Sequence, residues 1–208
     1  MRRLEKTIYW ALFVVLAMFS TKHLPAQPVP FGLYADGESL DIQFAGSVEV
    51  LDFGSITNTG ETITVRISLT EEDVGEVVPL VITGIRYLDV TVDFPPTIQL
   101  VQQGIEDGDE MTLSVGLAYS NRGLDLSEAR QSPTEVPLGM SSITFPIQRR
   151  TGGPPGPPPT PPHAGYTPPM GTAYIFVYGD LEVGDVSAGL YTGQIDIHVY
   201  YSDYGIGN

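Results

Sequence analysis

Few side chains in this sequence are suited to catalysis. The chain has three His residues and no Cys, which excludes a thiol nucleophile and a thiolate metal site. Asp196 and His198 lie on one face of a predicted strand, where they could form the Asp–His part of a triad directed at a Ser. No nucleophile-elbow motif accompanies them, and a solvent-exposed His beside an Asp is the simpler interpretation. We therefore expect a protein that is not an enzyme.

A second candidate site is the acidic sequence Glu106-Asp107-Gly108-Asp109-Glu110. Calcium binds carboxylate and backbone oxygens, so Asp107, Asp109 and Glu110 are candidate calcium ligands. The sequence lacks the ligand spacing of a calcium-binding hand, and a solvated hairpin turn is the simpler interpretation. We expect no other metal and no cofactor.

Aromatic residues alternate along one predicted strand at Tyr174, Phe176 and Tyr178. If these rings are exposed, they form a flat platform on which a glycan could stack. If they are covered, they pack against neighbouring strands, which is the interpretation that we favour.

The segment that follows residue 27 alternates apolar residues at Val29, Phe31 and Leu33. Such a strand could complete the sheet edge of a neighbouring copy through backbone pairing and pocket filling. Pro28 and Pro30 lack amide hydrogens, so this pairing would use one edge of the strand only. The alternative is an ordinary edge strand or a flexible terminus.

The chain of 208 residues is strongly acidic, with ten Lys and Arg residues against 25 Asp and Glu residues. Residues 1–26 hold four of the bases and one of the acids, so the remainder has six bases, 24 acids, no Lys and a net charge near −18. Such a chain is a poor partner for nucleic acids, whose phosphates are bound by Lys and Arg. An acidic, lysine-free surface is typical of proteins in concentrated salt, where screening weakens self-repulsion, so we hypothesise a saline habitat.

The first 26 residues have the parts of a secretory signal peptide. Arg2, Arg3 and Lys6 precede the apolar run Ile8–Phe19, and Leu24-Pro25-Ala26 precedes Gln27. The apolar run is shorter than the roughly 20 residues that a membrane-spanning helix needs. We therefore predict cleavage after Ala26 and a secreted or surface-located protein without a membrane span after cleavage.

Alternation of apolar and polar residues with a period of two dominates the sequence after residue 39, and Gly, Pro, Asn and Asp mark the turns. This pattern predicts an all-β fold, an antiparallel β-sandwich of about ten strands. The predicted strands are residues 39–44, 47–53, 61–69, 80–83, 87–94, 97–101, 110–119, 142–148, 173–183 and 191–201, and a helical turn is expected at 124–130.

Residues 151–170 interrupt this pattern with nine prolines and four glycines. Proline cannot donate a backbone hydrogen bond, so we expect a disordered, polyproline-like loop. About 38 residues follow the loop, which is too few for a stable second sandwich, and we predict a single domain over residues 27–208. A docking site for a proline-recognising partner is the functional alternative.

Two short motifs resemble those of a family of secreted bacterial proteins that is catalogued as a domain of unknown function and related to the spore coat protein U and pilin-like group. They are Leu51-Asp52-Phe53-Gly54 and Gly189-Leu190-Tyr191-Thr192-Gly193, and residues 178–184 match a third motif loosely. The resemblance implies an immunoglobulin-like sandwich that is exported, often surface-associated, and without known catalysis. The proline-rich insertion is not part of that pattern, and four residues follow Tyr204, unlike the C-terminus of a chaperone-assembled pilin.

These observations together favour an exported structural or adhesive surface protein, fimbria-like, that acts by binding and assembly. Its expected partners are further copies of itself or other surface proteins. The alternative is a soluble extracellular binding module for calcium or glycan.

Overall fold

The chain folds almost entirely into β-strands, as the alternation predicts. The computed structural model describes residues 22–24, 27–58, 60–69, 75–150 and 167–202, and these ranges contain 16 strands, ten of them with four or more residues. The longer strands are β3 (Phe31–Asp36), β4 (Asp41–Phe44), β7 (Ile63–Ile67), β8 (Val78–Ile85), β9 (Asp89–Asp93), β10 (Thr97–Gln102), β11 (Glu110–Ser120), β13 (Ser142–Pro146), β14 (Met170–Val183) and β16 (Ile195–Tyr201). The shorter strands are β1 (Lys22–Leu24), β2 (Pro28–Val29), β5 (Leu51–Asp52), β6 (Ile56–Asn58), β12 (Thr134–Glu135) and β15 (Tyr191–Thr192).

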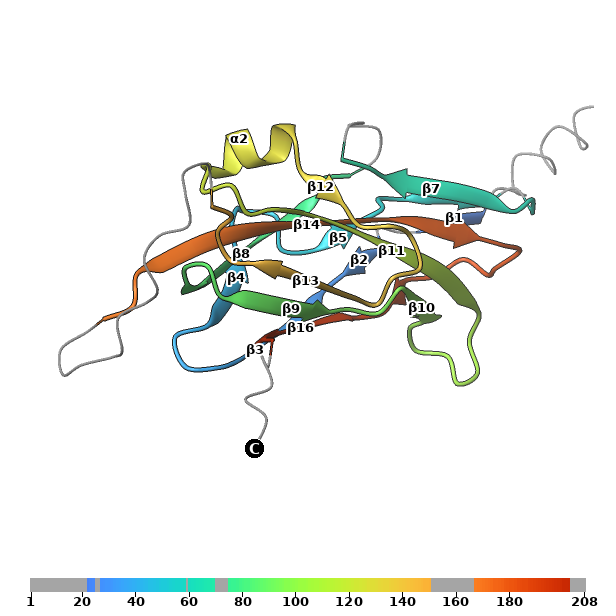
Figure 1. Ribbon diagram of the computed structural model, residues 1–208. Helices are drawn as coiled ribbons and strands as arrows, with labels where there is room; N and C mark the ends of the chain where they lie inside the picture. The colour runs from blue at the N-terminus through green and yellow to red at the C-terminus, as the bar shows by residue number, and fades with distance from the viewer. Residues whose placement is uncertain (1–21, 25–26, 59, 70–74, 151–166, 203–208) are drawn as a thin grey trace, which may run out of the picture.

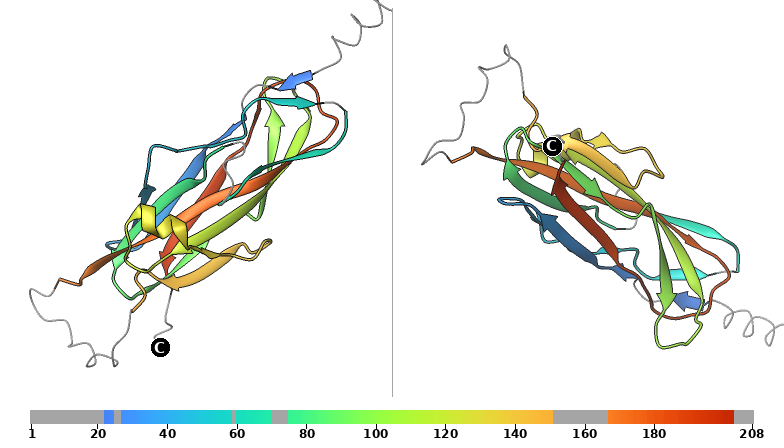
Figure 2. Two further views of the ribbon diagram at one scale, coloured as in Figure 1. Left: turned by 90° about the horizontal axis from the view of Figure 1, so that it is seen from above. Right: turned by 60° about the horizontal axis from the view of Figure 1, so that its bottom comes forward.

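Two sheets pack on each other as a sandwich (Figures 1 and 2). The larger sheet has the order β15-β10-β11-β14-β8-β4, with β12 paired to β11 and β7 paired to β14, and the smaller has the order β13-β9-β16-β3. Two small sheets, β1–β6 and β2–β5, complete the pairing. The prediction of an antiparallel sandwich is confirmed with one exception, because β3 runs parallel to β16 from Phe31↔Ile195 to Asp36↔Tyr200.

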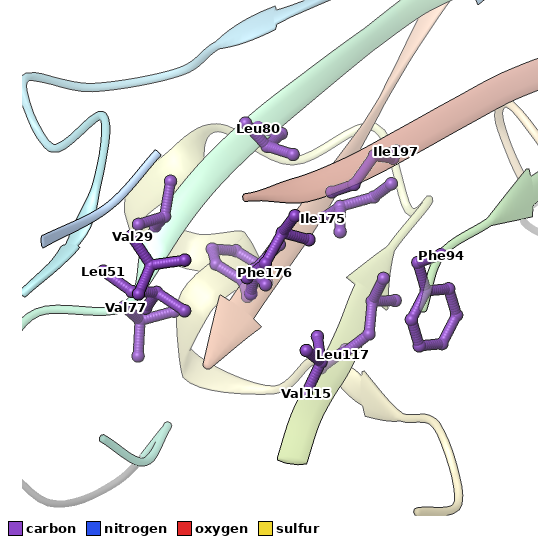
Figure 3. Packing of buried hydrophobic residues seen from close by; sticks show 14 of the residues in the cluster. Val29, Leu51, Val77, Leu80, Phe94, Val115, Leu117, Ile175, Phe176 and Ile197 are labelled. Atoms are coloured by element: carbon purple, nitrogen blue, oxygen red, sulfur yellow. The ribbon is translucent and has the colours of Figure 1, made fainter. Parts of the chain in front are cut away.

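Most of the core lies between the inner faces of the two sheets (Figure 3), and Phe176, Ala129 and Val136 extend it onto the outer face of the larger sheet. On β16, Ile195, Ile197 and Val199 are buried while Asp196 and His198 are exposed, as the alternation predicts. A ring stack joins the sheets, with the centroids of Tyr119 and Phe145 4.4 Å apart. Complete burial of an aliphatic side chain contributes about 1.5–3 kcal/mol, so this core holds the sheets together without disulfides.

Most predicted strands end within two residues of the observed ones, and three differ by more. Strand β14 begins at Met170 and therefore takes up the last residue of the predicted proline-rich loop, whose residues 151–166 lie outside the described ranges. The predicted strand 47–53 is reduced to β5, and the chain turns directly after it, where the Gly54 amide donates a hydrogen bond to Asp52 Oδ1 at 2.8 Å. The predicted strand 191–201 is split into β15 in the larger sheet and β16 in the smaller one. A Cβ atom at Gly193, between them, would lie 2.8 Å from the carbonyl oxygen of Gln99, so only glycine fits at this crossing.

The predicted helical turn at 124–130 is confirmed as α2 (Leu126–Gln131). The Asp125 side chain caps it by accepting a hydrogen bond from the Glu128 amide at 2.9 Å, and Ala129 is fully buried.

In the part of the chain that is described, no helix is long and apolar enough to cross a bilayer. Of the predicted signal peptide, only β1 lies in the described ranges, and cleavage after Ala26 would remove its pairing with β6.

Candidate functional site

A groove of about 590 Å³ crosses the outer face of the larger sheet. Its size falls in the range typical of ligand pockets. It runs over β7, β14 and β11 to the segment that follows β12, so its walls come from four parts of the chain that are distant in sequence. Its lining residues are Arg66, Ile67, Ser68, Ser114, Gly116, Glu135, Val136, Pro137, Leu138, Tyr178, Gly179 and Asp180.

The floor of the groove is the ring of Tyr178. Gly116 is its cross-strand partner, and a Cβ atom at Gly116 would collide with the Cε2 and Cδ2 atoms of this ring. The ring therefore lies across the Gly116 backbone instead of standing away from the sheet. This arrangement presents an aromatic surface toward the groove, with the phenol hydroxyl at its edge.

Charged groups line the same groove. Arg66 on β7 and Asp180 on β14 are cross-strand partners and form a bidentate ion pair, in which Nε and Nη2 donate to Oδ1 and Oδ2 at 2.8 Å each. Glu135 and Ser114 bring a further carboxylate and a hydroxyl, while Leu138 forms an apolar lip that is 75% exposed. The lining side chains therefore carry two carboxylates and one guanidinium.

The Tyr178 hydroxyl keeps its proton at neutral pH. Burial is the first cause that raises its pKa above 10.0, and the negative charges of Glu135 and Asp180 raise the pKa further. The phenol is therefore a hydrogen-bond donor beside two carboxylates. The groove can stack a flat apolar surface and hydrogen-bond to polar groups at its edge.

The three alternating aromatic residues of β14 have different environments. Phe176 is fully buried, Tyr174 is partly buried, and Tyr178 alone lines the groove. Figure 1 places α2 over this region of the outer face, and α2 contacts β14. Cross-strand packing thus accounts for Phe176, whereas Tyr178 is partly buried, like Tyr174, and lines the groove.

The predicted assembly segment lies within the fold of its own chain. Val29 on β2 is fully buried and pairs with Leu51, while Phe31 and Leu33 on β3 are partly buried and pair with Ile195 and Ile197 of β16. Phe31 and Leu33 complete the edge of the smaller sheet, whereas Val29 belongs to the small β2–β5 sheet. Pairing of the same segment with another copy stays a prediction.

The two short motifs, residues 51–54 and 189–193, both contact the first residues of this segment. The Gln27 side chain is fully buried, accepts a hydrogen bond from the Tyr191 amide at 2.6 Å and donates to the Gly189 carbonyl at 3.4 Å. Val29 pairs with Leu51 of the other motif. The motif residues are structural in this fold, and they position the first residues after the predicted cleavage site.

Tyr191 makes a pH-dependent contribution to stability. Its hydroxyl donates to the Ser187 carbonyl at 2.9 Å, and burial followed by the charge of Asp109 raises its pKa from 10.0 to about 12. Since the unfolded chain releases this proton first, the contribution is present below pH 10 and is lost as the pH rises towards 12. We expect a loss of at most about 2.7 kcal/mol in the free energy of unfolding from this group.

The test compares the urea midpoint of unfolding at about pH 8 with that at about pH 11.5. The difference between the two midpoints should be smaller in Tyr191→Phe than in the unmodified protein. An equal difference in both proteins would contradict the assignment.

The structure does not gather the candidate calcium ligands. Asp107 and Glu110 are exposed, and Asp109 Oδ2 accepts a hydrogen bond from the Ser187 amide at 2.6 Å. Across the described ranges, no three His, Cys, Asp or Glu side chains are placed to hold a metal ion. The calcium hypothesis therefore rests on the sequence alone.

The Asp–His pair of β16 lines a shallower depression of about 410 Å³, together with Ser141 and Ser142. The His198 ring stacks on Tyr34 of β3, with centroids 4.6 Å apart, and Asp196 Oδ1 accepts a hydrogen bond from Gln194 at 2.5 Å. Both side chains thus have partners other than a serine hydroxyl.

Sequence reasoning missed Arg66, Glu135 and Asp180 as site residues. They are ordinary solvent-facing positions of alternating strands, and only the pairing of β7 and β12 with the central strands brings them beside Tyr178.

Comparison of the chain with protein-family models and with curated proteins found no match.

Proposed function

We propose that this protein is an exported surface protein of adhesive type, which acts by binding and holds a neutral saccharide in the groove of Tyr178. The observation that carries the proposal is the aromatic floor between the Arg66–Asp180 ion pair and Glu135. The apolar face of a sugar ring stacks on such a floor, while its hydroxyls exchange hydrogen bonds with the carboxylates, the guanidinium and the phenol.

The charge of the groove favours an uncharged ligand. Two carboxylates face one guanidinium in the lining, and the whole chain has a net charge of −15. An anionic saccharide would meet repulsion from Glu135 and Asp180, which no further cation of the lining offsets. A neutral saccharide meets no such cost.

Tyr178→Ala is expected to weaken saccharide binding at least about tenfold, whereas Tyr178→Phe keeps the stacking face and loses less than about threefold. The probes are soluble neutral glucans, mannans, galactans and chitin oligosaccharides, with acidic oligosaccharides for comparison. Binding is measured by isothermal titration calorimetry. Tyr34→Ala is the matched control, since Tyr34 is 46% exposed on the other sheet. Absence of binding to every probe, or binding that Tyr178→Ala leaves unchanged, would refute the proposal.

A second candidate function is assembly through the N-terminal strand. Strand β3 lies at the edge of the smaller sheet, and the connection from β3 to β4 holds Ser39 in the left-handed region, with φ at 63°. Strain in a short connection favours exchange of the strand that it carries. A copy could thus receive β3 from a neighbour through the same backbone bonds.

A cysteine pair tests this second candidate. Tyr34 and His198 are cross-strand partners of β3 and β16, and the chain has no Cys of its own. In Tyr34→Cys/His198→Cys, exchange predicts disulfide-linked ladders on a non-reducing gel. A monomeric band with the thiols consumed would show that β3 stays in its own chain.

A further inference from the structure

Arginine is concentrated at one end of the sandwich. Six arginines follow residue 26, and the sixth, Arg66, pairs with Asp180 in the groove. The other five come from the ends of β8, β11 and β13 and from α2, and they form the arginine cluster: Arg86, Arg122, Arg130, Arg149 and Arg150. Backbone hydrogen bonds bring these segments together. The Arg149 amide donates to Asn121 at 2.7 Å, and the Arg86 amide donates to Pro169, next to the start of β14, at 2.8 Å.

The arginine cluster forms no ion pair of its own in the described ranges, although Asp36, Glu38 and Asp89 also lie at this end of the sandwich. Asp125 and Glu128 lie nearby in sequence as well. The Cζ atoms of Arg86 and Arg150 lie 5.9 and 5.0 Å from the centre of the Tyr87 ring, so two positive groups share one aromatic ring. The Arg86 Nε atom is buried and has no hydrogen-bond partner in the described part of the chain. Such a cluster favours an incoming carboxylate.

The opposite end of the sandwich carries the acidic turn between β10 and β11. Figure 1 shows this turn at the far end of the molecule from the first residues of β14. Its Glu106, Asp107 and Glu110 side chains are exposed, Glu182 pairs with Thr112 near the start of β11, and Asp185 follows the end of β14. Strand β14 alone has 14 residues, or about 45 Å of length, so the two charged ends are well separated.

Both ends also expose large apolar side chains. At the arginine end, Tyr87, Leu88 and Met170 are 42%, 39% and 41% exposed. At the acidic end, Ile105 at the turn is 53% exposed, with Val101 and Leu190 close to it on the β10–β15 pair. Each end therefore combines an apolar surface with charges that complement those of the other end.

We propose that copies of this protein associate head to tail, with the β10–β11 turn of one copy docked on the arginine cluster of the next. Ile105 would pack against Tyr87, Leu88 and Met170, while Glu106 and Glu110 would meet the guanidinium groups. Because the two surfaces differ and lie at opposite ends, the contact does not close on itself and leads to linear chains. The exposed apolar residues at both ends favour a folded second copy over an anionic polymer, which would supply charge alone. This inference goes beyond the saccharide groove and does not depend on it.

Two variants that each disable one end test the proposal. Arg149→Glu/Arg150→Glu removes the positive end, and Glu106→Lys/Glu110→Lys removes the negative end; all four residues are exposed. Light scattering coupled to size-exclusion chromatography should show the mass of the unmodified protein rising with concentration at low ionic strength. Molar salt should return it to the monomer, because the screening length is then about 3 Å.

Mixing the variants gives the sharpest outcome. Each variant alone should be monomeric, with association weakened at least about tenfold, and the equimolar mixture should associate into dimers or longer chains, because each variant keeps one intact end and the two reversed ends carry opposite charges. The control Glu49→Lys/Glu76→Lys has the same charge change at exposed positions away from both ends and should associate as the unmodified protein does. Monomers at all concentrations, salt-resistant oligomers or no association in the mixture would overturn the proposal. If the protein stays monomeric but binds dextran sulfate through Arg149 and Arg150, the cluster takes an anionic polymer and the proposal is likewise overturned.

Discussion

Replacing Phe176 by Ala is expected to lower the free energy of unfolding by about 3–5 kcal/mol. Phe176 belongs to the outer face of β14, where the alternation alone would leave it in solvent, yet its side chain is fully buried. Its cross-strand neighbour Ala118 and Ala129 of α2 are fully buried as well. The large effect is expected because truncation leaves a cavity in the hydrophobic cluster that rigid strands cannot close.

Urea unfolding followed by circular dichroism measures this change. Phe176→Leu keeps most of the apolar volume and should cost less than about 1.5 kcal/mol. An exposed position would tolerate either substitution within about 0.5 kcal/mol. A loss that small for Phe176→Ala would mean that α2 does not cover this face.

Removal of residues 27–36 is expected to abolish cooperative unfolding. These residues supply the fully buried Val29, the Gln27 side chain that satisfies the Tyr191 amide, and the whole of β3. Burial of Val29 contributes about 1.5–3 kcal/mol, and the orphaned Tyr191 amide costs about 1–3 kcal/mol. The backbone pairing of β3 with β16 is lost in addition. The sum is comparable to the total stability of about 5–15 kcal/mol that small domains have.

The comparison is between chains that start at Gln27 and at Gly37, unfolded in urea under the same conditions. A sharp transition with an unchanged midpoint in the shorter chain would show that the segment is dispensable. Addition of a peptide with the sequence of residues 27–36 extends the test. Recovery of the transition by the peptide would show that β16 accepts this strand from another molecule, as the second candidate function requires.

The alternation of residues predicted most of the secondary structure because it is a local property. Apolar residues at every second position of β16 must face the core wherever the strand lies, so Ile195, Ile197 and Val199 were identified from the sequence. The capped turn of α2 could be predicted for the same reason, since Asp125 and Glu128 are three residues apart. The prediction failed where a segment distant in sequence packs closely, as at Gly193, where the chain passes from one sheet to the other beside the Gln99 carbonyl.

The candidate site could be predicted only in part. Tyr178 was noted from its alternation with Tyr174 and Phe176, but which of the three rings stays accessible depends on where α2 and β12 lie. The ion pair of Arg66 and Asp180 joins residues that are 114 positions apart, and no sequence spacing indicates such a pair. The ion pair depends on the register of β7 against β14. A shift of β7 by one residue would turn the Arg66 side chain to the opposite face of the sheet.

The sequence by itself determined the all-β class, the inward face of each long strand and the acidic balance, because these follow from composition and from a two-residue period. Only the tertiary structure decided that the segment after residue 27 completes its own sheet beside β16, and that five arginines from four segments meet at one end. Strand order and sheet coverage depend on contacts between residues far apart in the chain, whose free energies are shared among many side chains. A local pattern carries no information about such contacts, so the groove and the two charged ends exist only in the folded molecule.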